Sequence, residues 1–315
     1  IDNVFLPARN DHPDFFNPHL EIVKGNLPGS TLNDEISFNS TYDCRIGNTT
    51  IPMDYYECVE NKIASLNPLQ VQIIWLQAPF GFPIDDPVNT TFTNYVNTTV
   101  ALYKKAMGRL KRQFPNLKVV YLSSLGYKGN VWNLDSSNAH VTEPFAYWHG
   151  FAVREVIQQQ IDGWADLSFQ NPGDTVPAML WGPYFWSNGP EPNMAGMTWE
   201  CPLDYSDRWH MTACAEERAA NIFFDFLCTD PTAQQWFLNS DNIDAALACF
   251  HSQGSVGNSD HDWHDSQTNG QVSINVGGSM FTGNKVGIGT TQPERDLHVN
   301  GDLAVNEKIY NGEDS

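Results

Sequence analysis

The chain contains 315 residues, carries a formal net charge of −20 at pH 7 and is rich in aromatic residues, with 18 Phe, 11 Tyr and 10 Trp. This length accommodates one large domain and a smaller one, and the aromatic content excludes a disordered chain. The acidic balance argues against nucleic acids and anionic membrane surfaces as partners, because both attract clustered Lys and Arg. No run approaches the ~18 apolar residues of a transmembrane helix, so no membrane span is expected.

Strands and helices are predicted to alternate along the first part of the chain. The clearest helix covers residues 96–114, where apolar side chains recur at alternating spacings of four and three and Pro115 ends the pattern. Further helices are predicted near residues 145–162 and after His210. Apolar runs predict strands at residues 20–25, 71–77, 117–124 and 177–182.

This alternation indicates βαβ units and an α/β fold, with a mostly parallel sheet that helices cover on both faces. Such sheets carry their functional groups at the carboxyl ends of the strands. We therefore expect a site near these segments: Gly25–Gly29, Gln77–Phe80, Ser123–Gly126 and Gly182–Tyr184.

Cysteines and glycosylation sequons indicate the compartment. The six cysteines lack the CxxC spacing of a zinc site, and their even number permits three disulfides. About 15 connectivities are allowed; the simplest is sequential, with bonds Cys44–Cys58, Cys201–Cys214 and Cys228–Cys249. The alternative is buried free thiols in a cytosolic protein. Asn-x-Ser/Thr sequons favour an extracellular, glycosylated protein, and they begin at Asn39, Asn48, Asn89 and Asn97.

The composition changes after Phe250, which predicts three parts: a domain of residues 1–250, a polar linker of residues 251–270 and a β-rich segment of residues 271–315. His261 and His264 in the linker are weak candidate metal ligands. A flexible linker does not supply the fixed geometry that a metal requires, so neither a metal nor another cofactor is expected. The β-rich segment is too small to form its own core and is expected to self-associate or to dock.

Asp207 and His210 are the first candidate catalytic pair, on a loop just ahead of a predicted helix. An Asp three residues before a His can hold the imidazole in one tautomer, as the base and its orienting carboxylate do in a nucleophilic triad. The alternative is a structural role, in which the carboxylate of Asp207 only accepts a hydrogen bond from the imidazole of His210.

Several stretches resemble extracellular members of the SGNH/GDSL hydrolase superfamily, across roughly residues 1–238. The resemblance implies a flavodoxin-like three-layer α/β/α sandwich with a parallel sheet. The stretches that carry it are Pro68–Leu76, Phe114–Ser124, Glu143–Val153, Trp181–Gly189 and Thr229–Phe237.

The resemblance also implies a site. In this superfamily a Ser nucleophile follows the first strand, a Gly and an Asn supply oxyanion donors, and a DxxH motif completes the triad. Asp207 and His210 match the DxxH motif, and Gly29 matches the glycine whose N–H would face the oxyanion. The chain departs from the pattern at Gln77, where the Asn is expected, and at Arg208 and Met211, which replace a common Gly and Pro.

The first strand and the nucleophile block of the superfamily would fall upstream of Ile1. Omission of a central strand leaves unpaired backbone groups inside a sheet. We therefore expect either that the polypeptide extends upstream or that another segment fills the slot. Strand donation between subunits would fill it and would build a polymer.

The segment Lys285–Leu303 resembles the VGIGTT-x-P-x-x-x-LHV-x-G repeat of fibre and adhesin-like surface proteins. This resemblance implies an elongated β assembly and indicates no ligand.

Two functions follow. The favoured one is a secreted, glycosylated structural or adhesive subunit of an extracellular fibre or filament, built on a degenerate SGNH-like domain that self-associates. The alternative is a secreted carbohydrate esterase, in which an upstream Ser acts with His210 as general base and Asp207 as its orienter. Its ligand would be a glycan or an ester, and aromatic residues could stack on sugar rings, namely Trp181, Tyr184, Trp186 and Trp209.

Overall fold

The computed structural model divides the chain into two compact units, one formed by Ile1–Asn193 and Met197–Val256 and one by Met194–Gly196 and Gly257–Ser315. The predicted boundary at residue 250 and the predicted linker lie outside the described residues. The structure describes residues 9–25, 32, 41–46, 49–63, 65–78, 89–126, 143–170, 173–189, 191–193, 197–199, 211–242, 280–282, 285–288 and 297–299.

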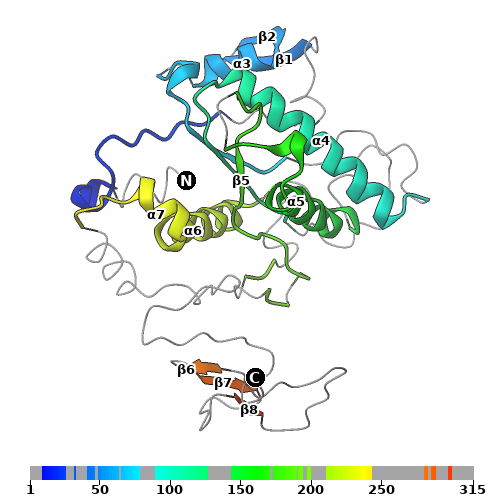
Figure 1. Ribbon diagram of the computed structural model, residues 1–315. Helices are drawn as coiled ribbons and strands as arrows, with labels where there is room; N and C mark the ends of the chain where they lie inside the picture. The colour runs from blue at the N-terminus through cyan, green and yellow to red at the C-terminus, as the bar shows by residue number, and fades with distance from the viewer. Residues whose placement is uncertain are drawn as a thin grey trace. The chain divides into compact units, whose positions relative to one another are not determined.

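A three-stranded parallel sheet forms the centre of the larger unit (Figure 1). Its strands are β3 (Ile73–Leu76), β4 (Val119–Leu122) and β5 (Ala178–Trp181), in the order β3-β4-β5. Ile73 pairs with Val119, and Val119 pairs with Ala178. These strands confirm the predicted runs of apolar residues, with shorter bounds, and they confirm an α/β fold with a parallel sheet.

The prediction of a strand at residues 20–25 is wrong, because this segment has no regular secondary structure. Its apolar side chains are used for packing: Leu20 and Ile22 contact one hydrophobic cluster and Val23 contacts another. An apolar run supplies burial, but a strand also requires a neighbouring backbone to complete its hydrogen bonds.

Two long helices pack against each other beside the sheet, α4 (Phe92–Gln113) and α5 (Phe145–Ile161). The helix α4 begins four residues earlier than the apolar pattern predicts. The reason is its cap at Thr91, whose side chain accepts a hydrogen bond from the Asn94 N–H. The helices α6 (Ala213–Thr229) and α7 (Pro231–Phe237) follow after a capped start at Thr212.

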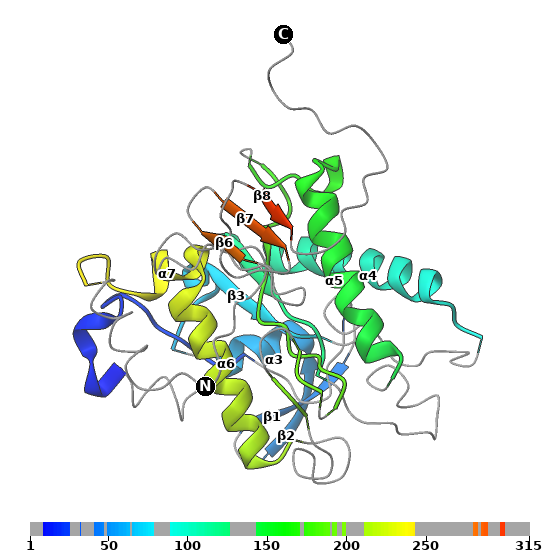
Figure 2. The same ribbon diagram turned by 90° about the horizontal axis from the view of Figure 1, so that it is seen from below.

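Alternate residues of β4 contact different hydrophobic clusters. Val120 and Leu122 belong to a cluster with side chains of α4 and α5, whereas Tyr121 belongs to a cluster with side chains of α6 and α7. In both views α6 lies on the other side of the strands from α4 and α5 (Figures 1 and 2). Since successive side chains of a strand point to opposite faces, the central strand β4 packs against helices on each of its two faces.

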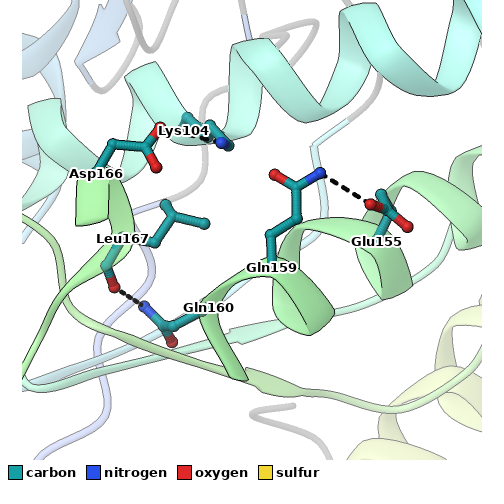
Figure 3. Close-up of polar contacts among 6 residues, drawn as sticks. All are labelled: Lys104, Glu155, Gln159, Gln160, Asp166 and Leu167. Carbon is teal, nitrogen blue, oxygen red and sulfur yellow. Dashed lines mark hydrogen bonds and ion pairs between the residues drawn. The ribbon is translucent and has the colours of Figure 1, made fainter. Parts of the chain in front are cut away.

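The buried side chain of Gln160 links α5 to the sheet through hydrogen bonds. Gln160 donates to the Leu167 carbonyl at 3.0 Å and to the Pro177 carbonyl at 3.1 Å, and it accepts from the Met179 N–H at 2.7 Å. Figure 3 shows its amide directed at Leu167, while the neighbouring Gln159 points away to Glu155. The Gln160 side chain therefore fixes the start of β5 against the last turn of α5.

A disulfide closes the N-terminal part of the larger unit. The strands β1 (Thr41–Ile46) and β2 (Thr49–Asp54) form an antiparallel hairpin, and Asp54 then caps α3 (Tyr55–Lys62). Cys44 of β1 is bonded to Cys58 of α3, and both are buried. The first of the expected disulfides is thus confirmed.

Replacement of Cys44 and Cys58 by Ala is expected to lower the free energy of unfolding by about 3 kcal/mol, because the bond joins residues with a sequence separation of 14. Urea unfolding followed by tryptophan fluorescence measures the loss. Cys214→Ala is the matched control, since Cys214 is an exposed free thiol. An unchanged midpoint for the double variant would contradict the expectation.

Other predicted covalent features fall partly outside the described residues. Cys214 is an exposed thiol and Cys228 a buried one, and the expected bonds Cys201–Cys214 and Cys228–Cys249 stay predictions. Cys201 and Cys249 themselves lie outside the described residues. Asn89 and Asn97 are exposed and accessible to a glycan, whereas Asn39 and Asn48 are not described.

The smaller unit contains a sheet of three short strands, β6 (Met280–Thr282), β7 (Lys285–Ile288) and β8 (Leu297–Val299). β6 pairs with β7 antiparallel, and β7 pairs with β8 parallel. The β character expected of this segment is present. Among the helices in the described ranges, none has the length and apolar character required to cross a membrane.

Candidate functional site

The residues carried over from the hydrolase pattern lie outside the described residues: Gly29, Asp207 and His210. The same holds for Arg208, Trp209 and the linker histidines His261 and His264. The described part of the candidate site is therefore the carboxyl edge of the sheet, where the loops after β3, β4 and β5 meet.

Two serines follow β4 at this edge, and both are fully buried. The Ser123 hydroxyl accepts the indole N–H of Trp75 at 2.8 Å. The Ser124 hydroxyl accepts the backbone N–H of Phe185 at 2.8 Å and that of Trp186 at 3.3 Å. Their hydroxyls join the loops of the sheet to one another and are closed off from solvent, so neither is placed to attack an external ester.

Gln77 stands where the resemblance led us to expect an Asn. Its side-chain amide donates to the Ser124 carbonyl at 2.7 Å. This bond commits the amide to a backbone group of the next loop. The residue therefore serves as a link between the ends of β3 and β4, a role that its place in the sequence did not indicate.

His149 is a buried polar residue that the sequence analysis did not single out. It lies in α5, with Nε2 at 2.9 Å from the Ala78 carbonyl oxygen and 2.9 Å from the Tyr103 hydroxyl. Because a carbonyl only accepts, we assign the proton to Nε2, which leaves Nδ1 as a buried acceptor with no hydrogen-bond partner among the described residues.

Burial lowers the pKa of His149 to about 4, and the hydrogen bond to Ala78 offsets part of this shift. The imidazole is therefore neutral at physiological pH. The signal for its position was present in the sequence, since Phe145, His149 and Val153 recur every four residues on the buried face of α5. On such a face a His is a structural core residue.

Glu143 holds an aromatic side chain at the same edge. One of its carboxylate oxygens accepts the Trp186 indole N–H at 2.9 Å, and the other accepts the Tyr147 N–H at 3.3 Å in the first turn of α5. Burial raises the pKa of Glu143, and the hydrogen bonds from Trp186 and Tyr147 oppose the shift. The carboxylate thus fixes the orientation of Trp186.

Gly182 permits the close approach of β4 and β5. An added Cβ would lie 2.6 Å from Ser123 Oγ and 3.3 Å from the Leu122 carbonyl oxygen. Gly182→Ala is therefore expected to lower the free energy of unfolding by about 1–3 kcal/mol, as measured by denaturant unfolding.

The Ser123→Ala change removes the atom that the new Cβ would meet. The double variant should consequently lose less stability than the two single variants together. Strictly additive losses would show that the contact with Ser123 is not the cause.

The aromatic residues that were predicted to stack on sugar rings lie in different environments. Trp181 is half-buried against the cluster of α4 and α5, so it acts as a core residue. Tyr184 lies over α5, where a Cβ on Gly150 would come within 3.2 Å of its ring. Trp186 stays at the edge of the sheet, and Trp209 is not described.

The described polar groups of this edge bond mainly to one another. Within the described ranges, no group of three or more His, Cys, Asp or Glu side chains could hold a metal ion. No known family, curated protein or solved structure compared with the chain matches it.

Proposed function

We propose that the protein is a secreted, glycosylated structural or adhesive subunit of an extracellular fibre, built on a degenerate SGNH-like domain with a three-layer α/β/α arrangement. The observation that carries the proposal is that the described polar side chains at the carboxyl edge of the sheet are engaged in internal hydrogen bonds. Ser123, Ser124 and Gln77 all use their side chains in internal hydrogen bonds there. An enzyme would require reactive groups that a substrate can reach.

Two further observations support an assembling, extracellular subunit. The bond Cys44–Cys58 fits an oxidising compartment, and the sequon residues Asn89 and Asn97 are exposed. The strands of the smaller unit are three to four residues long. Isolated sheets of this size are marginal in water and gain stability from a neighbour.

The edge of the central sheet offers a second means of assembly. Among the described strands β3 pairs only with β4, and Trp75 on β3 is 40% exposed. A strand edge of this kind attracts another strand. Donation of a strand by a neighbouring subunit would extend the sheet and link copies into a polymer.

Sedimentation velocity and negative-stain electron microscopy of the full chain test the proposal. We expect elongated particles whose size rises with concentration, and we expect a chain that ends at residue 270 to form fewer or shorter ones. A full chain that remains monomeric at all concentrations would overturn the structural role.

The alternative is a secreted carbohydrate esterase in which Asp207 and His210 act with an upstream Ser. The observation that favours it is the exposed aromatic rim beside the carboxyl edge, with Tyr147 and Phe92 at its surface. Hydrolysis of p-nitrophenyl acetate by native protein, abolished by His210→Ala, would establish this function. Equal rates for native protein and variant would exclude it.

A further inference from the structure

Five aromatic rings form a continuous strip beside the carboxyl edge of the sheet. They come from the start of α4, the first turns of α5 and the loop after β5. Successive ring centroids lie 4.5 Å, 5.1 Å, 5.3 Å and 5.7 Å apart along the strip. In this order the members of the aromatic strip are Trp186, Tyr147, Phe151, Phe92 and Trp148.

The aromatic strip is open to solvent at two of its members. Phe92 is 42% exposed and Tyr147 is 38% exposed, while Phe151, Trp148 and Trp186 are half-buried behind them. Their partial burial holds these rings in place, so the exposed surfaces are presented by a rigid group. Pre-ordered rings bind a ligand without the entropic cost of immobilising side chains on association.

Trp186 at one end of the strip is held from two directions. Glu143 accepts its indole N–H at 2.9 Å, and the Asn193 side chain donates to its backbone carbonyl at 3.0 Å. A mostly buried carboxylate is costly unless it is satisfied. The mostly buried carboxylate of Glu143 therefore fixes the orientation of the half-buried Trp186 ring at the end of the strip.

The chemistry of the strip favours one class of ligand. Pyranose rings present C–H faces that pack on aromatic faces, and their hydroxyls require nearby polar groups. Glu143 lies beside Trp186, and each of its carboxylate oxygens can accept a further hydrogen bond from a sugar hydroxyl. No Lys or Arg belongs to the strip, and the chain carries a net charge of −20, so an anionic ligand would be repelled.

We propose that the aromatic strip binds a neutral saccharide chain, with sugar rings stacked on Tyr147 and Phe92. The inference rests on the adhesive role proposed above and supplies its ligand class. It assigns a ligand-binding role to Phe92, Tyr147 and Trp186, which the structural role in a fibre does not require.

Biolayer interferometry on the full chain tests the proposal with defined probes: cellohexaose, N-acetylchitohexaose, mannohexaose and laminarihexaose, with hexagalacturonate as the anionic probe. At least one neutral probe should bind. Tyr147→Ala and Phe92→Ala should each weaken it at least tenfold, whereas Tyr147→Phe, which keeps the ring, should retain binding.

Trp164→Ala is the matched control. Trp164 is 49% exposed and follows the opposite end of α5, so its removal tests general adhesion of exposed aromatic rings. The Trp164→Ala variant should bind the neutral probe with the same affinity as the unaltered chain. Circular dichroism of each variant confirms that the fold is kept, as expected for exposed side chains.

Four results would overturn the proposal: binding of none of the neutral probes, tighter binding of hexagalacturonate, equal affinity in the Tyr147→Ala variant, or loss by Trp164→Ala as large as that by Tyr147→Ala. An oligomer that Tyr147→Ala dissociates, with saccharide affinity unchanged, would assign the strip to a second copy. Fibre formation is measured separately, so its absence alone counts against the structural role and leaves saccharide binding supported.

Discussion

His149 is expected to lower the free energy of unfolding by roughly 3 kcal/mol as the pH is lowered from 6.5 to about 4, because it is buried as a neutral imidazole. Its pKa is 6.5 in the unfolded chain and about 4 in the folded one. Between these values the unfolded state binds more protons. The contribution of His149 is therefore complete above pH 6.5 and is lost progressively as the pH falls to about 4.

Urea unfolding at a series of pH values measures this slope. His149→Gln removes the titrating group and retains an amide that can donate to Ala78, so its slope over the same range should be shallower. His19→Gln is the control, because His19 is exposed. Equal slopes for His149→Gln and the unaltered chain would show that His149 is not the source.

Glu143 acts in the opposite direction. Burial raises its pKa in the folded protein, so the folded state takes up this proton at a higher pH than the unfolded state does. Protonation of Glu143 therefore adds stability as the pH falls. Glu143→Gln should remove this gain and make the acid-induced loss from His149 steeper, which the same unfolding series measures.

Gln160→Ala is expected to lower the free energy of unfolding by roughly 3–5 kcal/mol. The side chain is 7% exposed and satisfies the carbonyls of Leu167 and Pro177 and the N–H of Met179. Its removal leaves three backbone groups without their partner and opens a cavity between α5 and β5. Denaturant unfolding measures the loss.

The adjacent Gln159 provides a matched control for Gln160. It lies in the same helix, and its side-chain amide donates to Glu155 one turn away, as Figure 3 shows. Gln159→Ala should change the free energy of unfolding by less than about 1 kcal/mol. Similar losses of unfolding free energy in the two variants would indicate a general effect on α5, and would argue against a specific link between Gln160 and β5.

Local patterns in the sequence predict much of the larger unit. The apolar runs that become β3, β4 and β5 and the periodic stripe that becomes α4 are each long and strongly patterned. Their connection by helices predicts a parallel sheet. The bond Cys44–Cys58 was also foreseeable, because the two cysteines are near neighbours in the chain.

Features that depend on tertiary partners were not predictable. Residues 20–25 have the apolar character of a strand, but strand formation depends on which backbone lies beside them. The roles of His149 and Gln77 depend on carbonyls of Ala78 and Ser124, which no spacing rule brings together. Asp207, His210 and Gly29 remain predictions, since they lie outside the described residues.

The links between the ends of β3 and β4 have a consequence for motion. The indole of Trp75 and the amide of Gln77 both cross to the loop after β4, and Ser124 continues the connection to Phe185 and Trp186 after β5. Displacement of one loop must break bonds to the next. Amide hydrogens of Phe185 and Trp186 should therefore exchange with deuterium as one cooperative unit, and Gln77→Ala should accelerate both together.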